Sequence, residues 1–134
     1  MKALTVKQPW AWALIHGGKD VENRSRPTKY RGQLYIHAGK GYATEALKFP
    51  AFSTLDLDFD VTGELDLGID VRGMVIGLVD VVDCHHWMEC GPGEGMCSEW
   101  AMEGHHHWTL ANPRPVEPFP AKGMLGIWNL EVTA

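Results

Sequence analysis

Three charged side chains lie within six residues of one another, directly after a pair of glycines. Lys19, Glu22 and Arg24 follow Gly17 and Gly18, and glycine permits the left-handed backbone that ends a helix and turns the chain. Lys19 could hold a phosphate or an oxyanion, Glu22 could accept a proton or a base amino group, and Arg24 could fork onto a phosphate. We interpret the cluster as a binding site, with Lys19 and Glu22 catalytic if the protein is an enzyme. A structural ion-pair cluster is the alternative.

A second group of residues has side chains of the kind that bind zinc. Histidines and cysteines occur in Cys84-His-His86, at Cys90 and Cys97, and in His105-His-His107. Their spacing matches no standard zinc finger, because no Cys-x-x-Cys pair is present. We therefore predict neither a metal site nor a cofactor, and interpret residues 84–107 as a His- and Cys-rich loop insertion. If zinc is bound, the candidate ligands are Cys84, Cys90, Cys97 and His105.

Residues before and after the Gly17–Gly18 turn could add to the charged binding site. Pro9 suits the first turn of a helix, whose free amides can bind an anion, while Gln8 could donate a hydrogen bond and Trp10 could stack on a base. His37 could reach the site from a strand end, and Arg114 is stiffened by a proline on each side. Structural roles are the alternatives. The full ligand-binding set is Gln8, Pro9, Trp10, Lys19, Glu22, Arg24, His37 and Arg114.

The charges are divided unevenly along the chain. The formal net charge is −5, with 12 basic and 17 acidic residues. Nine of the basic residues but three of the acidic ones fall within residues 1–50. A basic third joined to an acidic remainder can present one positive face to an anion. The alternative is that the two parts interdigitate and the field cancels.

The expected elements are short strands with few helices. Strands are expected over residues 3–6, 33–38, 73–82 and 123–132, the third being apolar on both faces and therefore central. A helix should run from Pro9 to the glycine pair, followed by a short strand or turn over residues 20–24. We predict a short helix over residues 44–49, a long loop or amphipathic turn over 54–70 and a proline-braced connector over 112–120. This pattern predicts an α+β fold built on a small mixed barrel with a few short flanking helices.

Length and composition place the chain in a broad class. With 134 residues and 45% hydrophobic residues, it is expected to form one domain over residues 1–134. No apolar run is long enough to span a bilayer, and the first residues do not resemble a signal peptide. We therefore predict a cytoplasmic protein without a membrane partner, present as a monomer or weak dimer.

Several segments resemble the ASCH domain family. They are Leu4-Thr-Val-Lys-Gln-Pro-Trp10, Gly18-Lys-Asp-Val-Glu-Asn-Arg24, Gly73-Met-Val-Ile-Gly-Leu-Val-Asp80, Trp108-Thr-Leu-Ala-Asn-Pro-Arg114 and Pro120-Ala-Lys-Gly123. They occur in the family's order and span nearly the whole chain. The resemblance implies a PUA-like β-barrel whose cleft is lined by Lys19, Glu22 and Arg24.

The resemblance also implies a ligand class. The family is proposed to bind RNA or nucleotides, and we predict that the cleft binds RNA, a nucleotide or a nucleobase. Some small bacterial members resemble amidohydrolases that remove the acyl group of N4-acetylcytidine with a Lys, a Thr three residues later and a distant Glu. Lys19 matches that Lys, Glu22 stands in place of the Thr, and Glu99 or Glu103 lies in the region of the distant Glu. The alternatives are therefore an amidohydrolase acting on an acylated pyrimidine nucleoside, and a zinc-stabilised interaction domain.

Overall fold

The computed structural model describes residues 1–54, 71–90 and 96–131. Within these ranges the elements are β1 (Lys2–Gln8), α1 (Trp10–His16), β2 (Val21–Arg24), β3 (Gly32–Tyr42), η1 (Thr44–Lys48), η2 (Pro50–Thr54), β4 (Met74–His86), η3 (Trp87–Glu89), β5 (His106–Pro120) and β6 (Ile127–Asn129). The η elements are short 3-10 helices. No helix among the described residues has the length and apolar character needed to cross a membrane.

The strands form one mixed sheet in the order β2-β5-β4-β3-β1-β6, in which only the β1–β3 pair is parallel. The predicted closed barrel is wrong, because β2 and β6 form the two ends of the sheet and do not pair with each other. These end strands have four and three residues, and each pairs with a neighbour on one side. A side chain spans part of the gap instead: Arg24 Nη2 donates to the Thr5 carbonyl at 2.9 Å.

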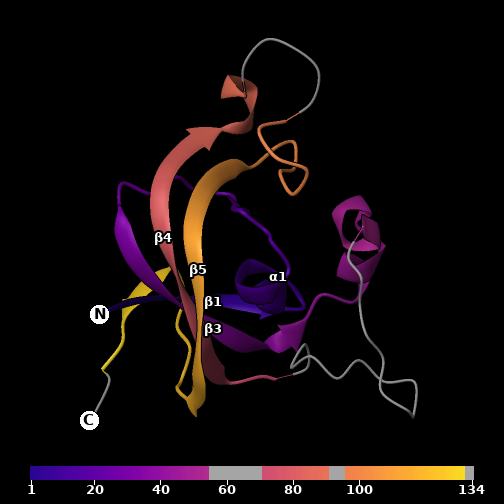
Figure 1. Ribbon diagram of the computed structural model, residues 1–134. Coiled ribbons are helices and arrows are strands. Elements are labelled where there is room, and N and C mark those ends of the chain that lie inside the picture. The colour runs from indigo at the N-terminus through magenta and orange to yellow at the C-terminus, as the bar shows by residue number, and fades with distance from the viewer. Residues whose placement is uncertain (55–70, 91–95, 132–134) are drawn as a thin grey trace.

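The main core lies between the curved sheet and α1 (Figure 1). Helix α1 contributes Leu14 and Ile15, and the sheet contributes Leu34, Ile36 and other aliphatic residues. The closest approach is at Gly77 of β4, where an added Cβ would lie 2.6 Å from Ile15 Cδ1 and 2.7 Å from a backbone oxygen. The helix therefore packs directly on the backbone of β4. This contact helps to position the turn that follows the helix.

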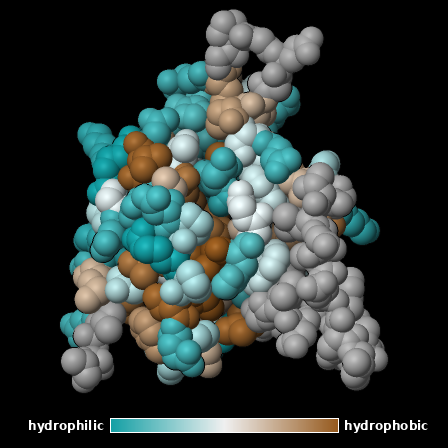
Figure 2. All heavy atoms as spheres, in the orientation of Figure 1, coloured by the Kyte–Doolittle hydropathy of each residue, from teal (hydrophilic) through white to brown (hydrophobic). Residues whose placement is uncertain are grey.

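An aromatic cluster covers the other side of α1. Trp12, Phe52 and Trp100 are buried there together with Val21 of β2. Trp10 packs on the same cluster, with its ring centroid 5.4 Å from that of Phe52 and 6.4 Å from that of Trp100. Figure 2 shows hydrophobic residues gathered over β4 and β5 at the centre of the face seen in Figure 1, with hydrophilic residues around them.

Most predicted elements are present, but they begin or end at other residues than predicted. The first strand, the helix that ends at Gly17, the short strand after it and the 33–38 and 73–82 strands are confirmed. The helix predicted over 44–49 is a 3-10 helix, and the closing strand is reduced to Ile127–Asn129. The predicted loop over 54–70 lies, apart from its first residue, outside the described residues.

The largest errors concern β4 and β5. Residues 84–86 and 106–107, predicted as part of a loop insertion, are the ends of these two long strands, and the predicted connector 112–120 belongs to β5. Proline is tolerated there because β2 pairs only with the first four residues of β5, from His106 to Thr109. The rest of β5 pairs with β4 alone among the described strands, and three register shifts interrupt that pairing.

Candidate functional site

The Lys19, Glu22 and Arg24 side chains meet in one ion-pair cluster. Lys19 Nζ lies 3.1 Å from Glu22 Oε1, and Arg24 Nε lies 2.9 Å from Glu22 Oε2, so that each carboxylate oxygen has its own cation. Lys19 Nζ also donates to the Val21 carbonyl at 2.6 Å. Gly18 makes this possible, because its φ of 75° turns the chain between the helix and β2.

Burial and charge act in opposite directions on this cluster. Lys19 is 4% exposed and Glu22 is 6% exposed. Burial lowers the pKa of Lys19, and the Glu22 carboxylate only partly offsets that effect. Burial would raise the pKa of Glu22, but the neighbouring Lys19 and Arg24 cations outweigh it, so that its pKa is lowered. Glu22 is thus held as a carboxylate between two cations.

The cluster forms one wall of a cavity of about 650 Å³. The cavity lies at the gap in the sheet, between β1 and β2, and Trp10, Lys19, Glu22 and Arg24 all line it. These four residues, which were predicted to lie around the glycine turn, therefore lie together at one cavity. Trp10 stands beside the cluster, with Lys19 Nζ 5.2 Å from its ring centroid.

Two further lysines give the cavity a positive rim. The exposed Lys7 of β1 and Lys40 of β3 line it, and Glu22 is the one acidic residue among its described lining residues. The uneven charge of the sequence therefore does survive folding at this place. Sequence reasoning missed both lysines as site residues. Lys7 directly follows the strand predicted over 3–6 and Lys40 lies two residues beyond the strand predicted over 33–38, and the parallel pairing of β1 with β3 places these strands side by side.

Distant segments complete the cavity. Met102 and His105 come from the stretch between β4 and β5, and Met124 and Leu125 come from the stretch before β6. Leu125 is 99% exposed and Met124 is 59% exposed. No local pattern in the sequence distinguishes these residues, because tertiary contacts alone bring them to the cavity.

The other predicted ligand-binding residues do not line this cavity. Gln8 is fully buried, where its Oε1 accepts from the Trp12 amide at 2.9 Å and its Nε2 donates to the Val71 carbonyl at 2.8 Å. Pro9 is buried just before α1. At the predicted anion-binding helix start, the Trp12 amide is therefore already bonded to a side chain of the protein.

His37 and Arg114 have structural partners. His37 is 2% exposed, with Nδ1 3.2 Å from Thr5 Oγ1 and Nε2 2.7 Å from the Ala121 carbonyl. It faces a neighbouring hollow of about 890 Å³ beside the stretch 120–125. Arg114 pairs with Asp80 at 3.1 Å across β4 and β5. This ion pair supports the structural role that was the alternative for Arg114.

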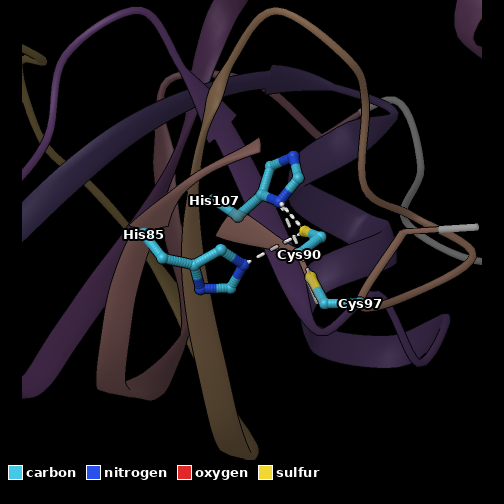
Figure 3. Close-up of side chains that lie close together, drawn as sticks. All are labelled: His85, Cys90, Cys97 and His107. Atoms are coloured by element: carbon cyan, nitrogen blue, oxygen red, sulfur yellow. Dashed lines mark hydrogen bonds between the residues drawn. The ribbon is translucent and has the colours of Figure 1, made fainter. Parts of the chain in front are cut away.

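A second polar cluster lies where β4 ends and β5 begins (Figure 3). His85, Cys90, Cys97 and His107 each place one potential ligand atom within 4.8 Å of those of the others. His85 and His107 face each other as directly paired residues of β4 and β5. His107 is fully buried, His85 and Cys90 are half-buried, and Cys97 is exposed.

Two of the candidate zinc ligands named from the sequence, Cys84 and His105, lie outside this cluster. Cys84 lies outside the cluster, because successive side chains of a strand point to opposite faces and His85 takes the outer one. Cys84 Sγ instead accepts from the Thr28 amide at 3.4 Å and packs on the main core. His105 also lies outside it, with Nδ1 2.9 Å from the Glu103 carbonyl, and lines the cavity.

The two thiols of the cluster differ in acidity. Burial, reinforced by the neighbouring Cys90, raises the pKa of Cys97 to about 11. Burial acts on Cys90 in the same sense, but hydrogen bonds from Cys97 and His85 outweigh it and lower the pKa of Cys90. Burial lowers the pKa of His107, whereas the hydrogen bond to Asp83 raises the pKa of His85.

A mixed sheet curled around one helix, with a basic cleft at its open side, defines a PUA-like α+β domain. The family model of the ASCH domain matches residues 4–120, and the chain belongs to the ASCH domain family. It is similar to activating signal cointegrator 1 of Homo sapiens, with 33% identity over 134 residues, and to that of Mus musculus, with 31% identity over 138 residues. Each match covers 96% of this chain but 22% of the relative, so the chain spans about a fifth of the length of these curated relatives.

Proposed function

We propose that the cavity between β1 and β2 binds a nucleotide unit of single-stranded RNA. The observation that carries the proposal is the gathering of Trp10, Lys19, Glu22 and Arg24 around one cavity with two exposed lysines on its rim. Four cationic side chains and one carboxylate line the cavity. This excess of positive charge favours a ligand with a negative backbone. Membership of the ASCH family supports the same ligand class.

Each residue has a role that its contacts support. Lys7 and Lys40 are exposed and can follow successive phosphates. Glu22 has one hydrogen bond at each oxygen, and a carboxylate oxygen has two lone pairs, so it can still accept a base amino group. Arg24, whose side chain is 28% exposed, positions Glu22 and presents its outer guanidinium edge to the cavity. Trp10 forms the apolar wall.

The salt dependence of RNA binding tests this proposal. A labelled single-stranded RNA is titrated with the protein at several salt concentrations, and binding is measured by fluorescence anisotropy. We compare Lys7→Ala/Lys40→Ala with Lys2→Ala/Lys29→Ala, which removes the same charge from exposed lysines outside the cavity lining. Each phosphate contact contributes roughly 0.7 to the slope of log K against log salt for single strands. The first variant should therefore lower the slope by about 1.4, and the second should leave it unchanged.

Equal loss in the two double variants would show only non-specific attraction and would contradict the proposal. Absence of binding by the unmodified protein at low salt would contradict it as well. A Glu22→Gln variant adds a separate check, because it should change the preference among homopolymer RNAs rather than the salt slope.

A second candidate function rests on a different observation. Burial lowers the pKa of Lys19 inside a cavity, and a lysine of lowered pKa can act as a base. We therefore propose, as the alternative, hydrolysis of an acylated pyrimidine nucleoside, with Lys19 and Glu22 transferring protons. Release of cytidine from N4-acetylcytidine by the protein, lost in Lys19→Ala and kept in Lys7→Ala, would favour it. A lack of turnover would leave the RNA-binding proposal.

A further inference from the structure

The four residues of the Cys/His cluster come from three separate places in the chain. His85 is the last but one residue of β4, His107 is the second residue of β5, and Cys90 and Cys97 lie in the stretch between the strands. In Figure 3 the two sulfur atoms and the facing ring nitrogens surround one small volume. This convergence follows from the strand register and not from sequence spacing, which is why no zinc-finger pattern reveals it.

Three sulfur–nitrogen distances in the cluster are those of a tetrahedral site. Zn–S bonds of about 2.3 Å and Zn–N bonds of about 2.0–2.1 Å at tetrahedral angles place a ligand sulfur about 3.5 Å from a ligand nitrogen. Cys90 Sγ lies 3.3 Å from His85 Nε2 and 3.2 Å from His107 Nδ1, and Cys97 Sγ lies 3.6 Å from His107 Nδ1. The side chains therefore need no large rearrangement to bind one ion.

The second nitrogen of each histidine is also held as in a metal site. His85 Nδ1 lies 2.8 Å from Asp83 Oδ2, and His107 Nε2 lies 2.7 Å from the Met102 carbonyl. Metal-binding histidines usually donate their other N–H to a carboxylate or a backbone carbonyl, which fixes the tautomer and the ring orientation. Both forms of that support occur here, one on each ring.

We propose that His85, Cys90, Cys97 and His107 form a structural zinc site that closes the end of the β4–β5 hairpin. Two thiolates and two imidazoles in a tetrahedral arrangement favour Zn²⁺ over the oxygen-preferring cations. Four protein ligands leave no open position for substrate, so the site is structural. On binding, the two thiols release their protons to solvent and the imidazoles bind through their neutral nitrogens.

The site would fix the stretch that forms part of the cleft wall. Residues between Cys97 and His107 include the buried Trp100 of the aromatic cluster and Met102 and His105 of the cavity lining. A metal ion bound at both ends of this stretch holds it against β2 and α1. The zinc site therefore acts on the architecture of the cleft and not on its chemistry, and it does not depend on which ligand the cleft binds.

Metal analysis and cobalt substitution test the proposal on the full chain. Protein produced with zinc in the medium and kept reduced should contain about one zinc ion per chain. Co²⁺ added to the metal-free, reduced protein should give the visible bands of tetrahedral cobalt and a near-ultraviolet thiolate charge-transfer band. Zinc should then bleach both sets of bands.

The matched controls replace one cysteine and one histidine that lie outside the cluster. Cys97→Ser, at the exposed ligand, should lose the charge-transfer intensity of one thiolate and weaken zinc binding at least tenfold, whereas Cys84→Ser and His106→Gln should keep both. Asp83→Asn should weaken zinc binding by about 10- to 100-fold, as expected for a group that orients a ligand, while leaving the cobalt spectrum tetrahedral.

Three outcomes would overturn the proposal. The first is reduced wild-type protein that binds neither zinc nor cobalt, and the second is a Cys90–Cys97 disulfide in protein isolated under non-oxidising conditions. The third is stoichiometric iron or copper in place of zinc. A Cys97→Ser variant that does not fold would not decide the matter, but the cobalt titration of the unmodified chain would still do so.

Discussion

The two polar clusters of this domain are built in opposite ways. At the cleft, the Glu22 carboxylate is shared by the Lys19 and Arg24 cations at 3.1 and 2.9 Å, which leaves one net positive charge. At the hairpin end, the four side chains of the Cys/His cluster carry sulfur and nitrogen donors that all suit a cation. The first cluster therefore contains charges of both signs, whereas the second contains only donors for the ion that we propose.

The clusters also differ in how the chain assembles them. Residues of the charge cluster lie within six positions, and one glycine turn brings them together. Residues of the Cys/His cluster span 23 positions and meet only because β4 and β5 pair in one register. Local sequence therefore encodes the first cluster, and sheet topology encodes the second.

The largest effect is expected from removing the shared carboxylate of the charge cluster. Glu22→Gln leaves the Lys19 ammonium, whose side chain is 2% exposed, without its counter-charge. Breaking a buried ion pair on one side costs about 3–5 kcal/mol, and we expect that loss in the free energy of unfolding measured by denaturant titration.

A control and a double variant sharpen this result. Asp80→Asn breaks the partly exposed pair with Arg114 and should change the stability far less. Lys19→Met/Glu22→Gln removes both charges of the buried pair and should be more stable than Glu22→Gln alone. Additive losses in the double variant would show that the buried ion pair carries no coupling.

Acid should affect the charge cluster in a defined pH range. The Lys19 and Arg24 cations lower the pKa of Glu22 below its ordinary value of 4.5, although burial acts against them. The unfolded state therefore takes up a proton before the folded state does, so the stabilisation is present above pH 4.5 and is lost as the pH falls below it. Unfolding curves of the wild type and Glu22→Gln should converge over this range and stay apart at neutral pH.

The second effect is expected at the Cys/His cluster. Zinc that binds only the folded chain, at 100 times its dissociation constant, should raise the free energy of unfolding by about 2.7 kcal/mol. Thermal unfolding followed by circular dichroism at increasing free zinc measures this shift. The same zinc concentrations should raise the free energy of unfolding of Cys97→Ser by about 1.4 kcal/mol or less, because its zinc affinity is at least tenfold lower. An equal shift in that variant would assign the effect to another site.

The sequence predicts those parts of the fold that depend on local pattern. The apolar run after Gly73, the helix before the glycine pair and the basic character of the cleft are all readable from it, and the structure contains them. Closure of the sheet is not readable, because it depends on whether strands from the two ends of the chain meet. Proline-rich residues 112–120 mislead for a related reason, since a strand tolerates prolines only where it has one partner.

The Cys/His region shows what composition alone conceals. The glycine, histidine and cysteine content of residues 84–107 led to the prediction of a loop, yet both ends of this range are strands. Continuing strand alternation three residues beyond the predicted end of the 73–82 strand would have placed Cys84 and His85 on opposite faces. The pairing of His85 with His107 required the register, which no local signal supplies.

A third and smaller effect is expected at the residue that connects the two clusters. Asn23 follows Glu22 in β2, and its side chain donates to the Trp100 carbonyl and accepts from the Met102 amide, both at 2.9 Å. Asn23→Ala removes two hydrogen bonds worth about 1 kcal/mol each, so the free energy of unfolding should fall by about 2 kcal/mol. Asn129→Ala, which removes one exposed contact with Lys2, is the matched control and should have little effect.

The smallest effect tests whether the two clusters communicate. Met102 is held by Asn23 at its amide and by His107 at its carbonyl, while the residue itself lines the cleft. Removing zinc frees His107 from the metal and loosens this hold, so RNA affinity should fall by about fivefold, at the lower end of usual coupling between sites. Anisotropy titrations with and without zinc measure the change, and Asn23→Ala should reduce it. Identical affinities in the two states would show that the zinc site stabilises the hairpin without shaping the cleft, and would separate the two clusters in function as they are separated in the sequence.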